Sequence, residues 1–144
     1  MEQIPYDEPT DIVAITVETF TARRAYEISD EYRRRGVATV MGGMHAVLIP
    51  EEVAEHCDCV ISGDAEPVWA DMLADFRNGC LKKHYIPVQP EFPQKNIIAR
   101  RDIFEGKGYL PITLLQFSRG CSHKCSFCAS SVYFKAHHYC RPVE

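Results

Sequence analysis

The chain has 144 residues, of which 46% are hydrophobic and 25% are charged, and its formal net charge is −4. This length and composition indicate one globular domain, or one small domain with part of another. The sequence has no basic tract interleaved with aromatic residues, which argues against a nucleic-acid partner, and no apolar run that approaches the roughly 18 residues needed to span a bilayer.

The cysteines and the first residues bear on the cellular compartment. Seven cysteines are an odd number, and three of them lie close together, which favours reduced thiols over a disulfide framework. Residues 1–11 are acidic and contain prolines, without the apolar core of a signal peptide. We therefore expect a cytoplasmic protein.

From residue 11 to residue 85 the chain alternates between strand and helix patterns. Three short runs rich in β-branched residues are typical of strands buried on both faces of a parallel sheet, at 12–17, 37–41 and 59–61. An edge strand is predicted near 83–86, and helices are predicted at about 21–35, 50–56 and 67–78. This alternation predicts an α/β fold with right-handed crossovers.

The first helix has the clearest pattern. Ala22, Ala25, Tyr26 and Ser29 recur at i, i+3, i+4 and i+7, so one face is small or apolar. Three arginines crowd its last turn, where the helix dipole favours cations, and the glycine that follows them is a suitable stop. We interpret the arginines as a solvated helix end.

Three polar or glycine-containing loops follow the strands, at 17–19, 42–45 and 62–66. In open parallel sheets ligands bind outside the carboxyl ends of the strands. Glycine there allows the backbone to approach a ligand, and hydroxyl groups offer hydrogen bonds. A Gly-Gly pair after a strand is also typical of a simple turn, so both interpretations stay open. No G-x-G-x-x-G or P-loop motif is present.

Beyond residue 86 the composition changes. Three prolines punctuate a polar stretch without periodicity, which predicts an extended linker over 87–109. Residues 96–104 have the composition of a short helix within it. Residues 112–118 are predicted to form a strand that leads into a cysteine-rich loop.

That loop contains Cys121, Cys125 and Cys128, spaced C-x3-C-x2-C. Thiolates this close together can converge on one metal centre, and sulfur ligands select iron–sulfur clusters, zinc or copper(I). A [4Fe–4S] cluster normally takes four cysteines, so a loop with three leaves one iron open. Zinc is the alternative, with His123 or Cys140 as the fourth ligand of a tetrahedral set.

The spacing of these cysteines, with Phe127 before the last and Ser-Arg-Gly before the first, resembles the signature of the radical S-adenosylmethionine superfamily. The resemblance implies a [4Fe–4S] cluster on the three cysteines, with S-adenosylmethionine on the fourth iron and Phe127 packed near its adenine. One-electron reduction would then cleave S-adenosylmethionine to a 5′-deoxyadenosyl radical. It also implies that residues 112–118 are the first strand of a TIM-like barrel, with the cluster loop at its carboxyl end.

The run 40–46, followed by 50–52 and 61–66, is similar to the cobalamin-binding domain of cobalamin-dependent radical S-adenosylmethionine enzymes. That domain is a flavodoxin-like, that is Rossmann-like, α/β unit placed before the radical domain. The resemblance implies cobalamin contacts from residues at the strand ends: Thr16, Thr19, Gly42, Gly43, His45, Ser62, Gly63 and Glu66.

Two features depart from that family. The loop at 63–66 reads Gly-Asp-Ala-Glu where the family often has Gly-Glu-Gly-Glu. The motif D-x-H-x-x-G is absent, so His45 is not expected to ligate cobalt; we expect it in a loop near the corrin ring or in solvent.

Together these features predict part of a cobalamin-dependent radical S-adenosylmethionine enzyme. Residues 1–86 would be an N-terminally incomplete cobalamin-binding-like domain, 87–109 a linker, and 110–144 the start of a truncated radical domain. The resemblance implies methyl transfer, cyclisation or rearrangement of a small-molecule substrate. It also implies an electron donor such as flavodoxin or ferredoxin, and a complementing chain for the rest of the barrel. The alternatives are a non-catalytic cobalamin-binding module and a zinc-stabilised interaction domain.

Overall fold

The computed structural model describes residues 4–87, 100–108, 112 and 116–140. The chain divides into two compact units, residues 1–90 and 91–144, which are described separately. Among the described helices, none combines the length and the apolar character that a membrane span requires.

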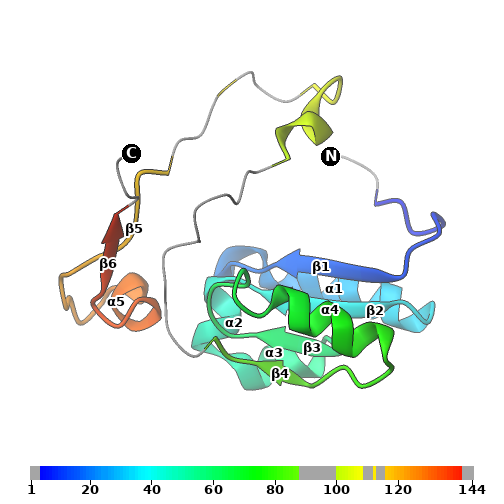
Figure 1. Cartoon of the computed structure of the whole chain (residues 1–144), viewed down its shortest axis with the longest axis horizontal. Coiled ribbons are helices and arrows are strands. Elements are labelled where there is room, and N and C mark those ends of the chain that lie inside the picture. The colour runs from blue at the N-terminus through cyan, green and yellow to red at the C-terminus, as the bar shows by residue number, and fades with distance from the viewer. Residues whose placement is uncertain (1–3, 88–99, 109–111, 113–115, 141–144) are drawn as a thin grey trace. The chain divides into compact units, whose positions relative to one another are not determined.

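The first unit is built on a four-stranded parallel sheet in the order β1-β2-β3-β4, so the strands lie side by side in chain order (Figure 1). Their bounds are Ile12–Thr16, Ala38–Gly42, Cys59–Ile61 and His84–Tyr85. Thr16 at the end of β1 lies opposite Gly42 at the end of β2. The prediction of a Rossmann-like α/β fold with a parallel sheet and a short edge strand is confirmed.

Helices connect the strands of this unit. The described elements are η1 Thr19–Thr21, α1 Ala22–Arg34, α2 Met44–Leu48, α3 Pro50–Glu55 and α4 Trp69–Arg77. Helix α2 replaces part of the loop predicted at 42–45. Its five residues are too few to show a helical period in the sequence, whereas the other three helices fall close to their predicted ranges.

Helix α1 forms where its apolar period predicts. Ala22, Ala25 and Ser29 are buried, which confirms the predicted face, and the helix stops before Gly36, whose φ is +80°. At its carboxyl end, hydrogen bonds from the Arg34 side chain and then from Arg35 hold the pKa of Glu31 below its ordinary value.

Both faces of the sheet are covered. Met41 and Val60 point into a core with α1, α2 and α3. The residues next to them on the strands, Val40, Cys59 and Ile61, point into a second core with α4. In Figure 1, α4 accordingly lies on the face opposite α1. The four parallel strands lie side by side in chain order, so each connection carries the chain in the same direction across the sheet. Connections on opposite faces of the sheet then have opposite hands. Because α1 and α4 cover opposite faces, the prediction that every crossover is right-handed is wrong.

The second unit contains η2 Arg101–Phe104, β5 Ser118–Gly120, α5 Ala129–Tyr133 and β6 His138–Cys140. Strands β5 and β6 pair antiparallel, with Gly120 opposite His138. Three residues of the predicted strand at 112–118, namely 113–115, lie outside the described residues, as does 88–99 of the predicted linker. Of the other four, only Ser118 lies in a strand, the start of β5. A short helix was predicted over 96–104, and η2 lies at its end.

Candidate functional site

The carboxyl edge of the sheet is closed by contacts between the ends of β1 and β2. The Val17 N–H donates to the Gly42 carbonyl (2.8 Å), and the His45 N–H donates to the Val17 carbonyl (3.1 Å). Gly43 lies between them with φ 97° and ψ −178°, a backbone region that is essentially restricted to glycine. A Cβ on Gly43 would lie 2.7 Å from the Val17 oxygen and 2.9 Å from its nitrogen. Gly43 is therefore needed for the approach of β1 itself.

His45 belongs to a hydrogen-bonded network beneath this edge. Its side chain is buried, at 3% exposure of the residue, and its ring nitrogens lie 3.2 Å from the Thr19 hydroxyl (Nδ1) and 3.0 Å from the Tyr26 hydroxyl (Nε2). The Tyr26 hydroxyl donates to Glu52 (2.9 Å), so it accepts from Nε2–H of His45; in the neutral imidazole Nδ1 then accepts from the Thr19 hydroxyl. Burial and then the hydrogen bond to Glu52 raise the pKa of Tyr26. The expectation of a loop or solvated histidine is thus corrected: His45 lies in α2 and is buried.

The loop after β3 is also held by the protein. The Ser62 hydroxyl lies 3.2 Å from the Ala46 carbonyl and 2.6 Å from Nε2 of His84. A Cβ on Gly63, whose φ is +140°, would lie 2.6 Å from Pro87. The Ser62 hydroxyl and the space beside Gly63 are therefore already used within the unit.

Parallel topology thus brings most of the predicted cobalamin residues to one edge of the sheet. Thr16 and Thr19 are exposed there, and Glu66 is half-buried in the segment before α4. A Cβ on Gly42 would meet Ile61 only at ordinary contact distance (3.6 Å). At this edge Thr16 and Thr19 are therefore exposed and Gly42 leaves room beside the backbone, whereas the Thr19 hydroxyl already contacts His45.

The cysteine loop joins β5 to α5 in the second unit. The Cys128 N–H donates to the Cys125 carbonyl (3.2 Å), and the Ser131 N–H donates to the Cys128 carbonyl (3.0 Å), so the last two cysteines share a turn that runs into α5. Hydrogen bonds from the backbone of Ser130 and then Ser131 lower the pKa of the Cys128 thiol. This favours the thiolate, the form that binds metals.

The donor set fits an iron–sulfur cluster in number and type. Cys121 and Cys128 are half-buried, Cys125 is exposed, and all three are free thiols. Their side chains are not gathered, because among the residues that the structure describes no group of three or more His, Cys, Asp or Glu is arranged to hold a metal ion. The three side chains would have to converge from one loop to ligate a common centre.

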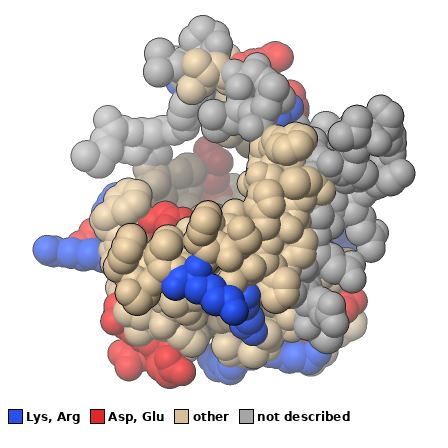
Figure 2. Space-filling model, turned by 90° about the vertical axis from the view of Figure 1, so that its left-hand side faces the viewer, with Lys and Arg blue, Asp and Glu red and all other residues tan. Residues whose placement is uncertain are grey.

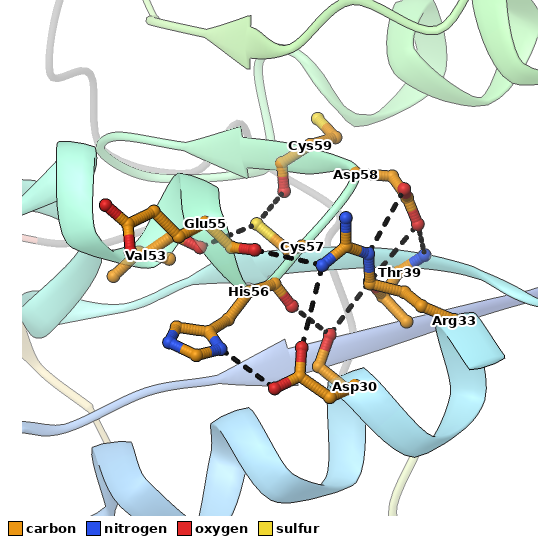
Figure 3. Close-up of polar contacts among 10 residues, drawn as sticks. Asp30, Arg33, Thr39, Val53, Glu55, His56, Cys57, Asp58 and Cys59 are labelled. Atoms are coloured by element: carbon orange, nitrogen blue, oxygen red, sulfur yellow. Dashed lines mark hydrogen bonds and ion pairs between the residues drawn. The ribbon is translucent and has the colours of Figure 1, made fainter.

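A polar cluster at the opposite, amino edge of the sheet was not predicted from the sequence (Figure 3). Arg33 donates to the Glu55 carbonyl (3.0 Å) and pairs with Asp30 (3.6 Å) and Asp58 (3.4 Å), and Asp58 accepts from the Thr39 N–H (2.9 Å). With the start of β2, Arg33 and Asp58 line an open hollow of about 420 Å³. In the sequence Arg33 is one of three adjacent arginines; its distinguishing signal is its position three residues after Asp30 on the buried side of α1.

Two cysteines of this region are structural. Cys57 and Cys59 are almost fully buried, and burial raises their pKa values to about 11 and about 12. The Cys57 thiol lies 3.3 Å from the Val53 carbonyl. Neither thiol is available as a thiolate ligand near neutral pH.

Figure 2 shows the distribution of charged side chains on one face of the molecule. Lys and Arg side chains are interspersed there with Asp and Glu, and among the described residues on that face no broad region of positive charge stands out.

The chain is similar to three methyltransferases. It is 38% identical to the bacteriochlorophyllide d C-8(2)-methyltransferase of Chlorobaculum tepidum, over 90% of this chain and 30% of that protein. It is 32% identical to the bacteriochlorophyllide d C-12(1)-methyltransferase of the same organism, over 96% of this chain and 32% of that protein. It is 27% identical to an uncharacterized methyltransferase of Pyrococcus horikoshii, over 86% of this chain and 32% of that protein. No protein-family model and no solved structure matches. The chain spans about a third of the length of these relatives, and over that span it is similar to proteins named as methyltransferases.

Proposed function

We propose that this chain is part of a radical S-adenosylmethionine methyltransferase that uses cobalamin. The observation that carries the proposal is the Cys121, Cys125 and Cys128 loop, in a chain that is similar over most of its length to named methyltransferases. In this proposal residues 1–86 bind cobalamin and residues 110–144 begin the radical domain of a cytoplasmic enzyme. Residues 87–109 are the linker between them. An electron donor such as flavodoxin or ferredoxin, and the remainder of the barrel, complete the system.

The three cysteines would hold a [4Fe–4S] cluster. When bound, the cluster would deliver an electron to S-adenosylmethionine, and cobalamin would carry the methyl group. Phe127 is 89% exposed beside Cys128, so its ring is free to stack on the adenine of S-adenosylmethionine. The turn between Cys125 and Cys128 keeps two of the ligands close to that ring.

The carboxyl edge of the sheet would receive cobalamin. Thr16 offers an exposed hydroxyl group, and Gly42 allows a close approach of the ligand to the end of β2. His45 would act from below by holding the Thr19 hydroxyl, since both of its ring nitrogens lie within hydrogen-bond distance of protein hydroxyls. This role agrees with the absence of a D-x-H-x-x-G motif.

The names of two relatives suggest the substrate class. Both Chlorobaculum proteins are named for methyl transfer to bacteriochlorophyllide d, a tetrapyrrole. We therefore propose a tetrapyrrole macrocycle as the substrate class, with the acceptor carbon set by parts of the enzyme beyond this segment.

Anaerobic reconstitution of the chain with iron and sulfide tests the proposal. We expect an absorption band near the border of the visible and ultraviolet, a paramagnetic signal after reduction, and loss of both in Cys125→Ala. Cys140→Ala is the matched control, because it removes an exposed thiol outside the motif. Retention of cobalamin without iron would favour a carrier module instead, and uptake of one zinc ion without colour would favour an interaction domain; either result contradicts the radical enzyme.

A further inference from the structure

The cysteine loop is braced at its beginning by a segment that follows α5. The Cys121 N–H donates to the His137 carbonyl (3.0 Å). Just before it, Gly120 has φ +89°, and a Cβ at this position would overlap the His137 carbonyl oxygen. Only glycine therefore lets the 137 carbonyl lie close enough to hold the Cys121 amide.

The bracing segment itself has an unusual backbone. Lys135 and Ala136 both adopt positive φ, 50° and 59°, a conformation that non-glycine residues rarely take. The turn is closed by the His137 N–H, which donates to the Phe134 carbonyl (2.8 Å). Two successive left-handed residues reverse the chain directly after α5, and this reversal presents the His137 carbonyl to the loop.

A second brace holds the middle of the loop. The Ser131 hydroxyl on α5 donates to the His123 carbonyl (3.2 Å), across eight residues of sequence. Ser131 also donates its N–H to the Cys128 carbonyl (3.0 Å). One residue therefore links the segment between the first two cysteines to the last cysteine.

We infer that Gly120 and Ser131 are positioning residues that set the shape of the cysteine loop before any cluster binds. The inference rests on the proposed function for its purpose, because a loop that is already shaped loses less conformational freedom when three thiolates converge on one centre. Neither residue offers a metal ligand. Gly120 acts through the backbone of the loop, and Ser131 acts through the His123 and Cys128 carbonyls and through its hydrogen bonds to the Cys128 thiol.

The first test compares Gly120→Ala with Gly106→Ala in the full chain. Gly106 has a similar φ of +71° but open space around its Cα, so this control carries the backbone strain without the steric overlap. We expect hydrogen exchange of the Cys121 amide in Gly120→Ala to rise by about fivefold or more, the change that follows loss of one backbone hydrogen bond. Gly106→Ala should exchange like the wild type. Equal exchange in the two variants would overturn the inference.

The second test uses the hydroxyl on α5. Ser131→Ala should lower the iron bound per chain after anaerobic reconstitution and broaden the paramagnetic signal, and Ser131→Thr, which keeps the hydroxyl, should restore both. Ser126→Ala is the control, since it removes an exposed hydroxyl from the same loop. Failure of Ser131→Thr to restore iron binding, or an equal loss in Ser126→Ala, would contradict the role of Ser131.

The bracing of the loop and the proposed function can fail separately. A wild-type chain that takes up no iron overturns the proposed function, whereas the amide exchange of Gly120→Ala against Gly106→Ala, measured without metal, still decides whether the loop is braced. The buried Cys57 and Cys59 thiols report separately whether the first unit of each variant is folded.

Discussion

Replacing Gly43 by alanine separates two explanations of the Gly-Gly pair after β2. If the glycine serves a ligand, the ligand-free protein should tolerate alanine. If it serves the approach of β1, the ligand-free protein should lose stability. The structure favours the second, because a Cβ would lie 2.7 Å and 2.9 Å from backbone atoms of Val17, which cannot rotate away as a side chain would.

The expected size of the effect follows from two contributions. The φ of 97° and ψ of −178° cost a residue other than glycine about 1–3 kcal/mol. Moving Val17 away weakens its hydrogen bonds to Gly42 and His45, which contribute about 1 kcal/mol each. We therefore expect a loss of about 3 kcal/mol from the free energy of unfolding.

Gly36→Ala is the matched control, since Gly36 also has positive φ (+80°) but nothing within 4 Å of the added Cβ. It should cost about 1 kcal/mol. Thermal unfolding of the ligand-free chain, followed by circular dichroism, should then show a fall in Tm of at least about 10 °C for Gly43→Ala and about 5 °C for Gly36→Ala. Equal shifts, or a stable Gly43→Ala that only loses ligand affinity, would refute the packing explanation.

Three further predictions concern the first unit. Ser29→Ala removes a fully buried hydroxyl that lies 2.6 Å from the His56 carbonyl, so the free energy of unfolding in urea should fall by about 1–3 kcal/mol; a loss below about 0.5 kcal/mol would show that the carbonyl finds another partner. The pKa of Glu31 is lowered on folding, so its contribution is present above its ordinary pKa of 4.5 and is lost as the pH falls through the lower folded value. Glu31→Gln should therefore be less stable than the wild type at pH 7, with a gap in urea midpoint that narrows towards pH 3; a constant gap contradicts the linkage. Burial keeps Cys57 and Cys59 protonated, so site-resolved alkylation at pH 8 should modify the other five thiols first, and rapid labelling of either buried thiol would contradict the fold.

The sheet was predictable because the apolar residues of its strands indicate burial on both faces. The run Cys59–Ile61 has apolar side chains on both faces, and both faces are indeed covered. The same property hides which face the next helix takes. A strand that is apolar on both sides accepts a helix on either side, so the sequence pattern offered no signal that α4 would cross to the face opposite α1.

The candidate site was predictable in place but not in detail. Parallel topology brings strand ends together, so the strand pattern of the sequence is enough to place Thr16 and Gly42 at one edge. The burial of His45 could not be inferred in the same way, because it depends on the Tyr26 hydroxyl of another helix and on the short helix α2. Arg33 was hidden for a related reason, since its partners Asp58 and the Glu55 carbonyl follow it by more than 20 residues.

A glycine beside a predicted ligand loop can serve either the approach of the ligand or the close packing of another segment, and the sequence alone does not separate the two. Gly43, Gly63 and Gly120 all precede or belong to loops predicted to hold a cofactor, and in each case the space left by the missing Cβ is occupied by another segment of this chain. Gly42 differs, because its Cβ would meet only ordinary contacts. A glycine can be assigned to ligand approach only where no part of the chain uses the space, so at the carboxyl edge Gly42 is a better candidate than Gly43 for contact with the proposed cobalamin.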